Sequence, residues 1–366
     1  MTAAVPIPHQ KGTHMNTIRV GVNGYGVIGK RVADAVLLQL DMDLVGVADI
    51  ATDWRIKSAA SRLPVFASTI EAQQAMRAAD VTARGVLDDL LAQCDVVVDT
   101  TPKHVAAGNL ERYRALGVKV VLQGGESHST TGHSFVAQAN YASAIGRDST
   151  RVVSCNTTSI VRILGALDAA GLLLRARGVL IRRATDPWES HLGGVMNTMV
   201  PEPTIPSHQG PDAQTVLPGL DVVTIAAKGA HTQTHSHYWT LQLTREATRD
   251  EVLDALRAAP RIAFIRMSDG LVALNSTVEL MRDLGRPRGD MWEVAVWEDL
   301  VTVNGSEAYL AYQVYNEAIV VPETIDAIRA LTGTVPDAAT SIRLTDESLG
   351  MRQDFLTAAA EPGHDR

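Results

Sequence analysis

The sequence predicts an α/β protein with a doubly wound parallel sheet in its first half and a second, catalytic α+β domain, built on a mixed or antiparallel sheet, in its second half. Short apolar strands alternate with helix-like segments up to residue 153, a glycine-rich turn joins the first strand to the first helix, and later strands follow with fewer helices between them. The chain has 366 residues, 46% hydrophobic and 20% charged, which is enough for two domains with separate cores.

The first half begins with a predicted βαβ unit. Thr17–Val22 (TIRVGV) is an apolar run typical of a buried strand, Lys30–Leu40 (KRVADAVLLQL) repeats apolar residues with helical period, and Leu44–Ala48 is a second strand. Two more apolar strands are predicted at Val96–Asp99 and Val118–Leu122. Strands that alternate with helices in this way form a parallel sheet.

The turn after the first strand, NGYGVIG, matches G-x-G-x-x-G through Gly24, Gly26 and Gly29. Between a strand and a helix, the first glycine permits a tight turn, the second lets a pyrophosphate approach the backbone, and the third lets the helix pack on the strand. The free N–H groups at the helix N-terminus, with about half a positive charge, then bind the phosphates. The motif therefore predicts a Rossmann-type dinucleotide site.

Asp49 ends the second predicted strand. An acid at this place accepts hydrogen bonds from an adenosine ribose and repels a 2′-phosphate, so the sequence predicts NAD as the preferred cofactor, with NADP as the alternative. A further interpretation is that Asp49 caps a helix and contacts no cofactor.

The second half is predicted to contain strands in series. A helix is predicted at Ile160–Ala170, a surface helix at Arg249–Ala258, and a closing helix that returns to the first domain at Thr324–Leu331. The strand-like stretches are Gly178–Arg183, Val222–Ala227 and Tyr238–Leu243.

We predict four segments along the chain. They are a disordered leader at 1–16, a dinucleotide-binding domain at 17–153, a catalytic and substrate domain at 154–315, and a C-terminal part at 316–366 whose helix returns to the nucleotide domain. The change from alternating strands and helices to strands in series places the main boundary just before Cys155.

The composition argues against two classes of partner. The net charge of −8 comes from dispersed residues of both signs, without the basic stripe that binds nucleic acid. No apolar run is long enough to cross a bilayer, and the start MTAAVPIPHQKGTHMNT lacks the apolar stretch of a signal peptide. We therefore expect a cytoplasmic protein with no nucleic-acid or membrane partner.

Only two cysteines occur, and neither lies in a cluster with disulfide or zinc-ligand spacing. Cys94 enters a buried strand and is predicted to be a core residue. Cys155, in VVSCNTTS, could be a buried hydrophobe or a nucleophile that attacks a carbonyl carbon. A helix that begins at 156–158 is predicted to lower the pKa of its thiol through the N-terminal dipole, with Ser154 and Thr157 offering capping oxygens.

A histidine near this thiol would hold or relay its proton. The candidates are His208, in PSHQGPD, and the pair His235 and His237, which share one face if they lie in a strand. One of the pair could ligate a metal while the other is polar surface, but no third ligand is apparent, so we predict no metal. Arg182 and Arg183 end a strand, so at most one aims into a site while the other forms a salt bridge.

Several motifs occur in the order typical of one enzyme family. NGYGVIGKRVADAV, LQGGE, SCNTT, RRATDP and PSHQGPD, followed by SDGLVALNSTVELMRDLGRPRGDMWEVAVWED and VVPETIDAIRAL, resemble the archaeal-type (type II) phosphorylating glyceraldehyde-3-phosphate dehydrogenases. The similarity covers nearly the whole chain after residue 16. The resemblance implies a homotetramer that oxidises glyceraldehyde 3-phosphate to 1,3-bisphosphoglycerate with NAD(P) and inorganic phosphate, through a thiohemiacetal and a thioester on a cysteine.

The resemblance also implies roles for single residues. Cys155 is the implied nucleophile, and His235, which matches the first His of the family's Met-His-x-His segment, is the implied base. The implied substrate-binding residues are Ser154, Asn156, His208 and Gln209. The cofactor-binding residues are then Gly24, Gly26, Val27, Ile28, Gly29, Asp49, Gly125, Arg183 and Asn316.

The chain departs from the family pattern at several positions. His208-Gln209 replaces a His-His pair, AHTQTH replaces a PTTLMH-like run, the segment 190–197 lacks the family's lysines, and Asn316 replaces a Gln. Oxyanion binding rests on charge-assisted hydrogen bonds, so these losses leave a different aldehyde, in a phosphorylating or hydrolytic reaction, as an alternative. Two other interpretations are a nucleotide-binding regulatory protein without the chemistry and a buried, inert Cys155.

Overall fold

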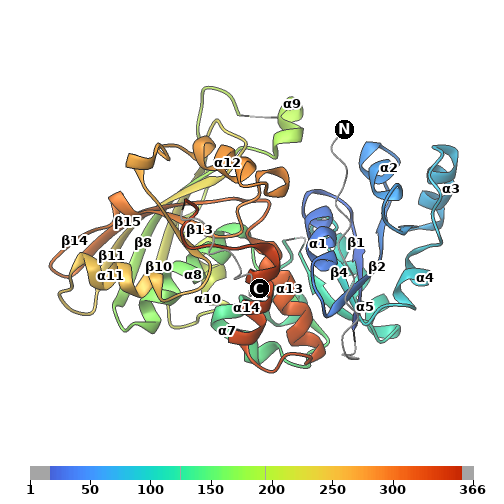
Figure 1. The fold of residues 1–366 in the computed structure, drawn as a ribbon, viewed down its shortest axis with the longest axis horizontal. Helices are drawn as coiled ribbons and strands as arrows, with labels where there is room; N and C mark the ends of the chain where they lie inside the picture. The colour runs from blue at the N-terminus through green and yellow to red at the C-terminus, as the bar shows by residue number, and fades with distance from the viewer. Residues whose placement is uncertain (1–16, 124, 194, 357–366) are drawn as a thin grey trace, which may run out of the picture.

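The computed structural model describes residues 17–123, 125–193 and 195–356, so the predicted leader at 1–16 lies outside the described residues. Figure 1 shows two halves, each with its own sheet, and the helices α13 (Val320–Thr332) and α14 (Ala338–Leu349) where the halves meet. None of the helices within the described ranges is long and apolar enough to cross a membrane.

The first sheet has seven parallel strands in the order β3-β2-β1-β4-β5-β7-β6. Its strands are β1 (Ile18–Asn23), β2 (Met42–Asp49), β3 (Val65–Ala67), β4 (Val96–Asp99), β5 (Lys119–Leu122), β6 (Ser134–Phe135) and β7 (Ser149–Val152). The helices of this half are α1 (Val27–Leu37), α2 (Trp54–Ala60), α3 (Ile70–Ala78), α4 (Leu87–Leu91), α5 (Val105–Ala115), α6 (His128–Thr131) and α7 (Ala137–Ala144). The direction in which successive strands are added to the sheet reverses at β1, which lies between β2 and β4. This reversal confirms the predicted doubly wound sheet.

The first helix is displaced from its predicted position. It begins at Val27 because Gly26, with an extended backbone, serves as its N-cap, and the glycine turn therefore leads directly into the helix. It ends at Leu37, and Leu40, which was predicted to lie inside it, is 99% exposed. The strand Val96–Asp99 has the predicted bounds, and all four of its residues are buried.

The second sheet has eight strands in the order β12-β13-β15-β11-β8-β10-β9, with β14 paired to β15. β8 is parallel to β10 and β12 to β13, whereas β11 is antiparallel to both β8 and β15, so the predicted mixed sheet is confirmed. The strands are β8 (Leu173–Arg182), β9 (Val200–Pro201), β10 (Val222–Lys228), β11 (His235–Leu243), β12 (Ile262–Ile265), β13 (Val294–Trp297), β14 (Thr302–Asn304) and β15 (Glu307–Val314). The helices of this half are α8 (Cys155–Ala169), α9 (Ser190–Gly193), α10 (Gln209–Gln214), α11 (Arg249–Arg257) and α12 (Leu274–Asp283).

The chain crosses from the first sheet to the second in a short link. β7 ends at Val152, and α8 begins at Cys155. α13 lies against α1, α7, β5 and β7 of the first half, which is where the closing helix was expected. The division of the chain at residues 153 and 315 stays a prediction.

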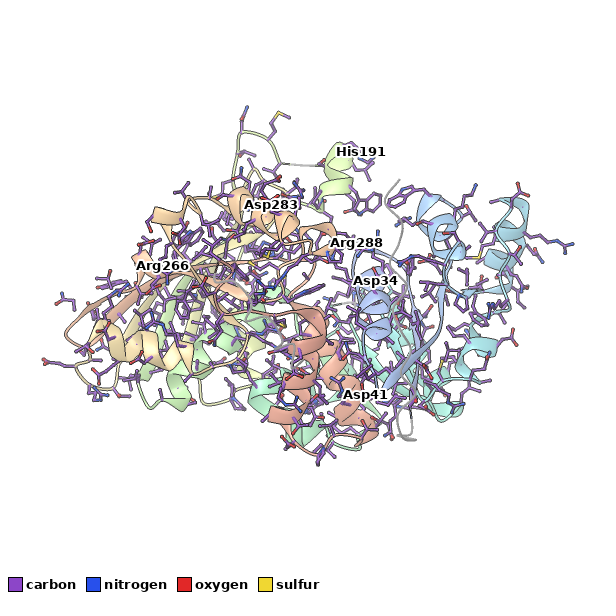
Figure 2. All side chains as sticks on the ribbon, in the orientation of Figure 1. Asp34, Asp41, His191, Arg266, Asp283 and Arg288 are labelled. Atoms are coloured by element: carbon purple, nitrogen blue, oxygen red, sulfur yellow. The ribbon has the colours of Figure 1, made fainter. Side chains whose placement is uncertain are left out.

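Ion pairs join the two halves around α1. Arg31, which is buried on α1, donates to Asp290 at 2.8 Å and to Glu317 at 2.6 Å. Arg288 pairs with Asp34 of α1 at 2.8 Å, and Figure 2 shows these two labelled residues where the halves meet. Buried charges of this kind are stable only while each keeps its partner.

A second group of buried charges surrounds Glu323 on α13. Its carboxylate accepts from Arg162 of α8 at 2.6 Å, from Arg261 at 3.0 Å and from the backbone N–H of Ala137 at 2.6 Å. The side chains of Glu323 and Arg162 are fully buried and that of Arg261 is 1% exposed. Although burial disfavours the charged form, the two guanidinium groups hold the pKa of Glu323 below its ordinary value.

We expect Glu323→Ala to lower the free energy of unfolding by about 3–5 kcal/mol, because it leaves the guanidinium group of Arg162 buried without its carboxylate, whereas Arg261 keeps Asp326 and Asp346. Urea denaturation followed by circular dichroism measures this change. The matched control, Glu279→Ala, removes the exposed partner of Arg282 and should change the free energy by less than about 1 kcal/mol. Equal effects of the two substitutions would contradict the role of Glu323.

Candidate active site

Cys155 is the first residue of α8, directly after the link that follows β7. Ser154 is the N-cap, with extended backbone angles (φ −61°, ψ 162°), and its Oγ accepts from the N–H of Thr157 at 3.3 Å. The predicted capping by Ser154 is confirmed. The cap fixes the first turn of the helix and thereby the direction of the thiol.

His235 begins β11 and lies opposite this thiol. Its Nε2 is 3.4 Å from Cys155 Sγ, and its Nδ1 accepts from the backbone N–H of Arg183 at 3.0 Å. Because a backbone N–H can only donate, Nδ1 carries no proton, and the neutral ring has its proton on Nε2, facing the sulfur. The structure thus brings together Cys155 and His235, which lie 80 residues apart in the sequence.

The prediction that the helix N-terminus lowers the pKa of Cys155 is wrong in its net direction. Burial raises the pKa of the thiol by more than Arg183, Arg182 and the first N–H groups of α8 lower it. Burial also lowers the pKa of His235 well below its ordinary value, assisted by His237 and Arg183. The thiol and the neutral imidazole are therefore the favoured forms of this pair.

His237 and Asn156 form a second contact between β11 and α8. His237 Nε2 is 2.8 Å from Asn156 Oδ1, and His237 Nδ1 is 2.9 Å from the hydroxyl of Tyr312 on β15. His237 is fully buried, which corrects the prediction that one histidine of the pair is polar surface. Across the part of the chain that the structure describes, no group of three or more His, Cys, Asp or Glu side chains could hold a metal ion.

The carboxylate of Glu202 contacts two predicted site residues, His208 and Gln209, and also Arg182. It pairs with Arg182, accepts from Gln209 at 3.3 Å and lies 3.0 Å from His208 Nδ1. Arg183 forms a separate ion pair with Asp186 at 2.6 Å. Arg182 and Arg183 therefore both form salt bridges, whereas a salt bridge was expected for only one of them. The alternation of strand faces did not predict this, because β8 ends at Arg182 and Arg183 lies beyond it.

The glycine turn has the geometry that a pyrophosphate requires. Gly24 has φ +96°, and a Cβ on Gly29 would lie 1.8 Å from the carbonyl oxygen of Gly24, so neither position accepts a side chain. Next to Gly26, by contrast, a Cβ would meet no atom within 4 Å. Thr100 of the neighbouring strand end donates to the Gly24 carbonyl at 2.6 Å and fixes the turn. Open space at the second glycine, with Val27 and Ile28 beginning the helix, fits a dinucleotide.

Asp49 is the last residue of β2, beside this turn. Its Oδ2 accepts from the backbone N–H of Tyr25 at 2.5 Å and its Oδ1 from that of Ala51 at 2.8 Å. The N-cap of the following helix, α2, is Asp53, so Asp49 does not cap that helix. Its carboxylate lies where the ribose was expected.

Asn316 and Gly125 complete the predicted cofactor residues. Asn316 Oδ1 accepts from the N–H of Thr234, next to His235, at 3.1 Å, and its buried Nδ2 has no partner among the described residues. A buried, unpaired donor at this place fits a ligand that accepts hydrogen bonds. Gly125 follows β5 with φ +78°, and within the described ranges no hydrogen bond connects it to the Cys155–His235 pair.

Several residues of this site were missed from the sequence. Glu202, Tyr312 and Thr100 each reach it from another element, and no local motif marks them. Arg151 of β7 was missed as well; it pairs with Asp212, which also accepts from Thr157 of α8 at 2.8 Å. These contacts become visible only in the structure, where strands and helices that are distant in the sequence lie side by side.

Comparison with known proteins supports the resemblance seen in the motifs. Residues 154–299 match the family model of the C-terminal domain of glyceraldehyde 3-phosphate dehydrogenase, and residues 18–157 match that of the dihydrodipicolinate reductase N-terminus. A glyceraldehyde-3-phosphate dehydrogenase of Pyrobaculum calidifontis is 47% identical over 91% of this chain and 97% of its own length. Proteins of the same name from Methanococcoides burtonii and Archaeoglobus fulgidus are each 40% identical, over 92% and 93% of this chain and 100% of their own length. The chain therefore belongs to the glyceraldehyde-3-phosphate dehydrogenase family.

Proposed function

We propose that this protein is an NAD-dependent, phosphorylating glyceraldehyde-3-phosphate dehydrogenase that forms a thioester on Cys155 and works as a homotetramer. The observation that carries the proposal is the Cys155–His235 pair at the start of α8, with 3.4 Å between sulfur and Nε2. Relatives at 40–47% identity over nearly their whole length bear this name.

The first half of the chain supplies the proposed cofactor site. Gly24, Gly26 and Gly29 leave room for a pyrophosphate, and the N–H groups that begin α1 at Val27 and Ile28 would bind it. Gly125, Arg183 and Asn316 are the further proposed contacts. A nicotinamide dinucleotide bound here would supply the acceptor for a hydride.

Cys155 is the proposed nucleophile. The thiol first loses its proton to water, and the thiolate accepts the Nε2–H of His235. Its sulfur then attacks the aldehyde carbon; a C–S bond forms, and the π electron pair of the carbonyl moves onto oxygen. His235 is thus a proposed hydrogen-bond donor to sulfur, and the base role implied by the resemblance would require it to give up its bond to the Arg183 N–H.

The second part of the reaction releases the cysteine as a thiolate. When the hydride leaves the thiohemiacetal carbon, the C=O bond forms again and a thioester remains on Cys155. Inorganic phosphate attacks this carbonyl carbon, the C–S bond breaks, and the thiolate leaves with the bonding pair. The product is the acyl phosphate, and the cysteine is ready for another aldehyde.

The groups that could bind a substrate phosphate surround Glu202. Arg182, His208 and Gln209 are the proposed donors, but all three already contact the carboxylate of Glu202. This observation favours a second candidate function, the same covalent reaction on an aldehyde without a phosphate group. An anion would have to displace a carboxylate to reach these donors.

A panel of aldehydes tests the proposal. We expect NADH formation to be fastest with glyceraldehyde 3-phosphate and to require inorganic phosphate, as measured at 340 nm with phosphorylated and unphosphorylated aldehydes, each with and without phosphate. Faster turnover of an unphosphorylated aldehyde would support the second candidate. A protein that binds NAD but oxidises no aldehyde would instead support the regulatory interpretation.

Replacing Cys155 tests the covalent step. We expect Cys155→Ala to reduce kcat at least about 10³-fold, because the nucleophile is lost, while the Kd for NAD changes less than about twofold. Rapid-mixing kinetics and fluorescence titration measure the two quantities. Cys94→Ala is the matched control, since Cys94 is buried with its pKa raised to about 12 and should leave kcat unchanged. Substantial turnover by Cys155→Ala would sink the mechanism.

Replacing Asp49 tests the cofactor preference. The wild-type protein is expected to have a higher kcat/KM with NAD than with NADP, because the carboxylate repels a 2′-phosphate. Asp49→Asn should raise kcat/KM for NADP by about tenfold or more and lower that for NAD, as measured by steady-state kinetics with both cofactors. Asp53→Asn, at the cap of α2, is the control and should leave the ratio unchanged. A wild-type preference for NADP would refute this assignment.

A further inference from the structure

Alternate residues of β11 contact consecutive residues of α8. Side chains two apart in a strand share a face, and here that face is directed at the first turn of the helix. His235 Nε2 lies 3.4 Å from Cys155 Sγ, and His237 Nε2 lies 2.8 Å from Asn156 Oδ1. The proposed mechanism uses the first contact and leaves the second, fully buried contact without a role.

The ring of His237 is held on both sides. Tyr312 lies directly opposite His237 in the β11–β15 pair, its hydroxyl is 2.9 Å from Nδ1, and the two ring centroids are 4.9 Å apart. Burial, together with Arg182, lowers the pKa of His237 to about 3. The imidazole is therefore neutral wherever the enzyme would work, and it cannot act as a proton carrier there.

A neutral imidazole has one donor and one acceptor nitrogen, and its partners decide which is which. Asn156 presents its carbonyl oxygen, so Nε2 carries the proton and donates. Nδ1 is then the acceptor, and the Tyr312 hydroxyl donates to it. The chain from Tyr312 through His237 thus fixes which end of the Asn156 amide faces β11.

Fixing Oδ1 leaves the NH₂ group of Asn156 as the free end. In the described part of the chain no residue accepts a hydrogen bond from Nδ2, and Asn156 adjoins the thiol in sequence. A preorganised amide donor of this kind stabilises negative charge that develops on oxygen. We infer that His237 and Tyr312 are positioning residues that present Asn156 Nδ2 to the negatively charged oxygen of the thiohemiacetal, which was the carbonyl oxygen of the aldehyde.

This inference rests on the proposed function, because it concerns the oxygen that becomes negative when Cys155 attacks. Its effect should fall on kcat and leave the binding of cofactor untouched. Tyr312→Phe removes one hydrogen bond between neutral groups, so it should reduce kcat by about fivefold. Loss of the Asn156 amide itself should reduce kcat by about 10²-fold.

A double-mutant cycle tests the inference. Tyr312→Phe and Asn156→Ala are made singly and together, and kcat is measured with the aldehyde that the wild-type protein oxidises fastest. If Tyr312 acts through Asn156, Tyr312→Phe reduces kcat in the wild-type background but has no further effect when Asn156 is already Ala. Multiplicative losses in the double variant would overturn the inference.

Two further comparisons separate positioning from a general structural role. Tyr309→Phe, on the same strand with Tyr309 38% exposed, should leave kcat unchanged. His237→Gln keeps an amide donor for Asn156 and should retain more activity than His237→Leu. Alkylation of Cys155 by iodoacetamide should proceed at the wild-type rate in Tyr312→Phe, because the His235 contact remains; a slower rate would indicate disturbance of the whole site and contradict the inference.

The same experiment distinguishes failure of the inference from failure of the proposed function. A wild-type protein that oxidises only an unphosphorylated aldehyde would overturn glyceraldehyde 3-phosphate as substrate, while the cycle run with that aldehyde still reports on Asn156. A wild-type protein that is active on glyceraldehyde 3-phosphate but gives multiplicative losses would leave the proposed function standing and overturn the positioning role.

Discussion

Glu323 accepts hydrogen bonds from Arg162 and Arg261 where none of the three charges reaches water, and the positions of several elements depend on that contact. Glu323 thereby joins α13 to α8 and to the start of β12. The same carboxylate also accepts from the N–H of Ala137, which joins α13 to α7. Arg162 lies seven residues after Cys155 on α8, which is roughly 10 Å along the helix axis and on nearly the same face. The buried charges therefore set both the depth and the rotation of the helix that presents the thiol.

The site is assembled from rigid elements. A capped helix start supplies Ser154, Cys155 and Asn156, and a strand held on both sides supplies His235 and His237. Burial keeps both imidazoles neutral, and the backbone of Arg183 and the hydroxyl of Tyr312 each fix one ring. Such a site acts through dipoles that are oriented before substrate arrives, which is the condition under which they stabilise charge most strongly.

The features that could be predicted from the sequence are those with a local signal. The glycine turn, the buried strand Val96–Asp99 and the cap at Ser154 each depend on neighbouring residues, and the structure has them as predicted. The start of β11 at His235 was missed because its first three residues are polar, although all are buried. No local sequence pattern predicts the contacts of Glu202 and Tyr312, because their partners lie on other elements. The pKa of Cys155 was misjudged because the helix dipole is visible in the sequence and desolvation is not.

Gly26 shows how one residue can serve two incompatible demands. It is the N-cap of α1, yet it provides no side chain to accept from the N–H groups of the first turn. A serine there would make the helix more stable by roughly a few tenths of a kcal/mol, but its side chain would enter the open space beside the turn. Selection for a more stable fold and selection for room at the turn thus act in opposite directions at this position. An engineer who seeks thermostability by optimising every helix cap should leave this one alone.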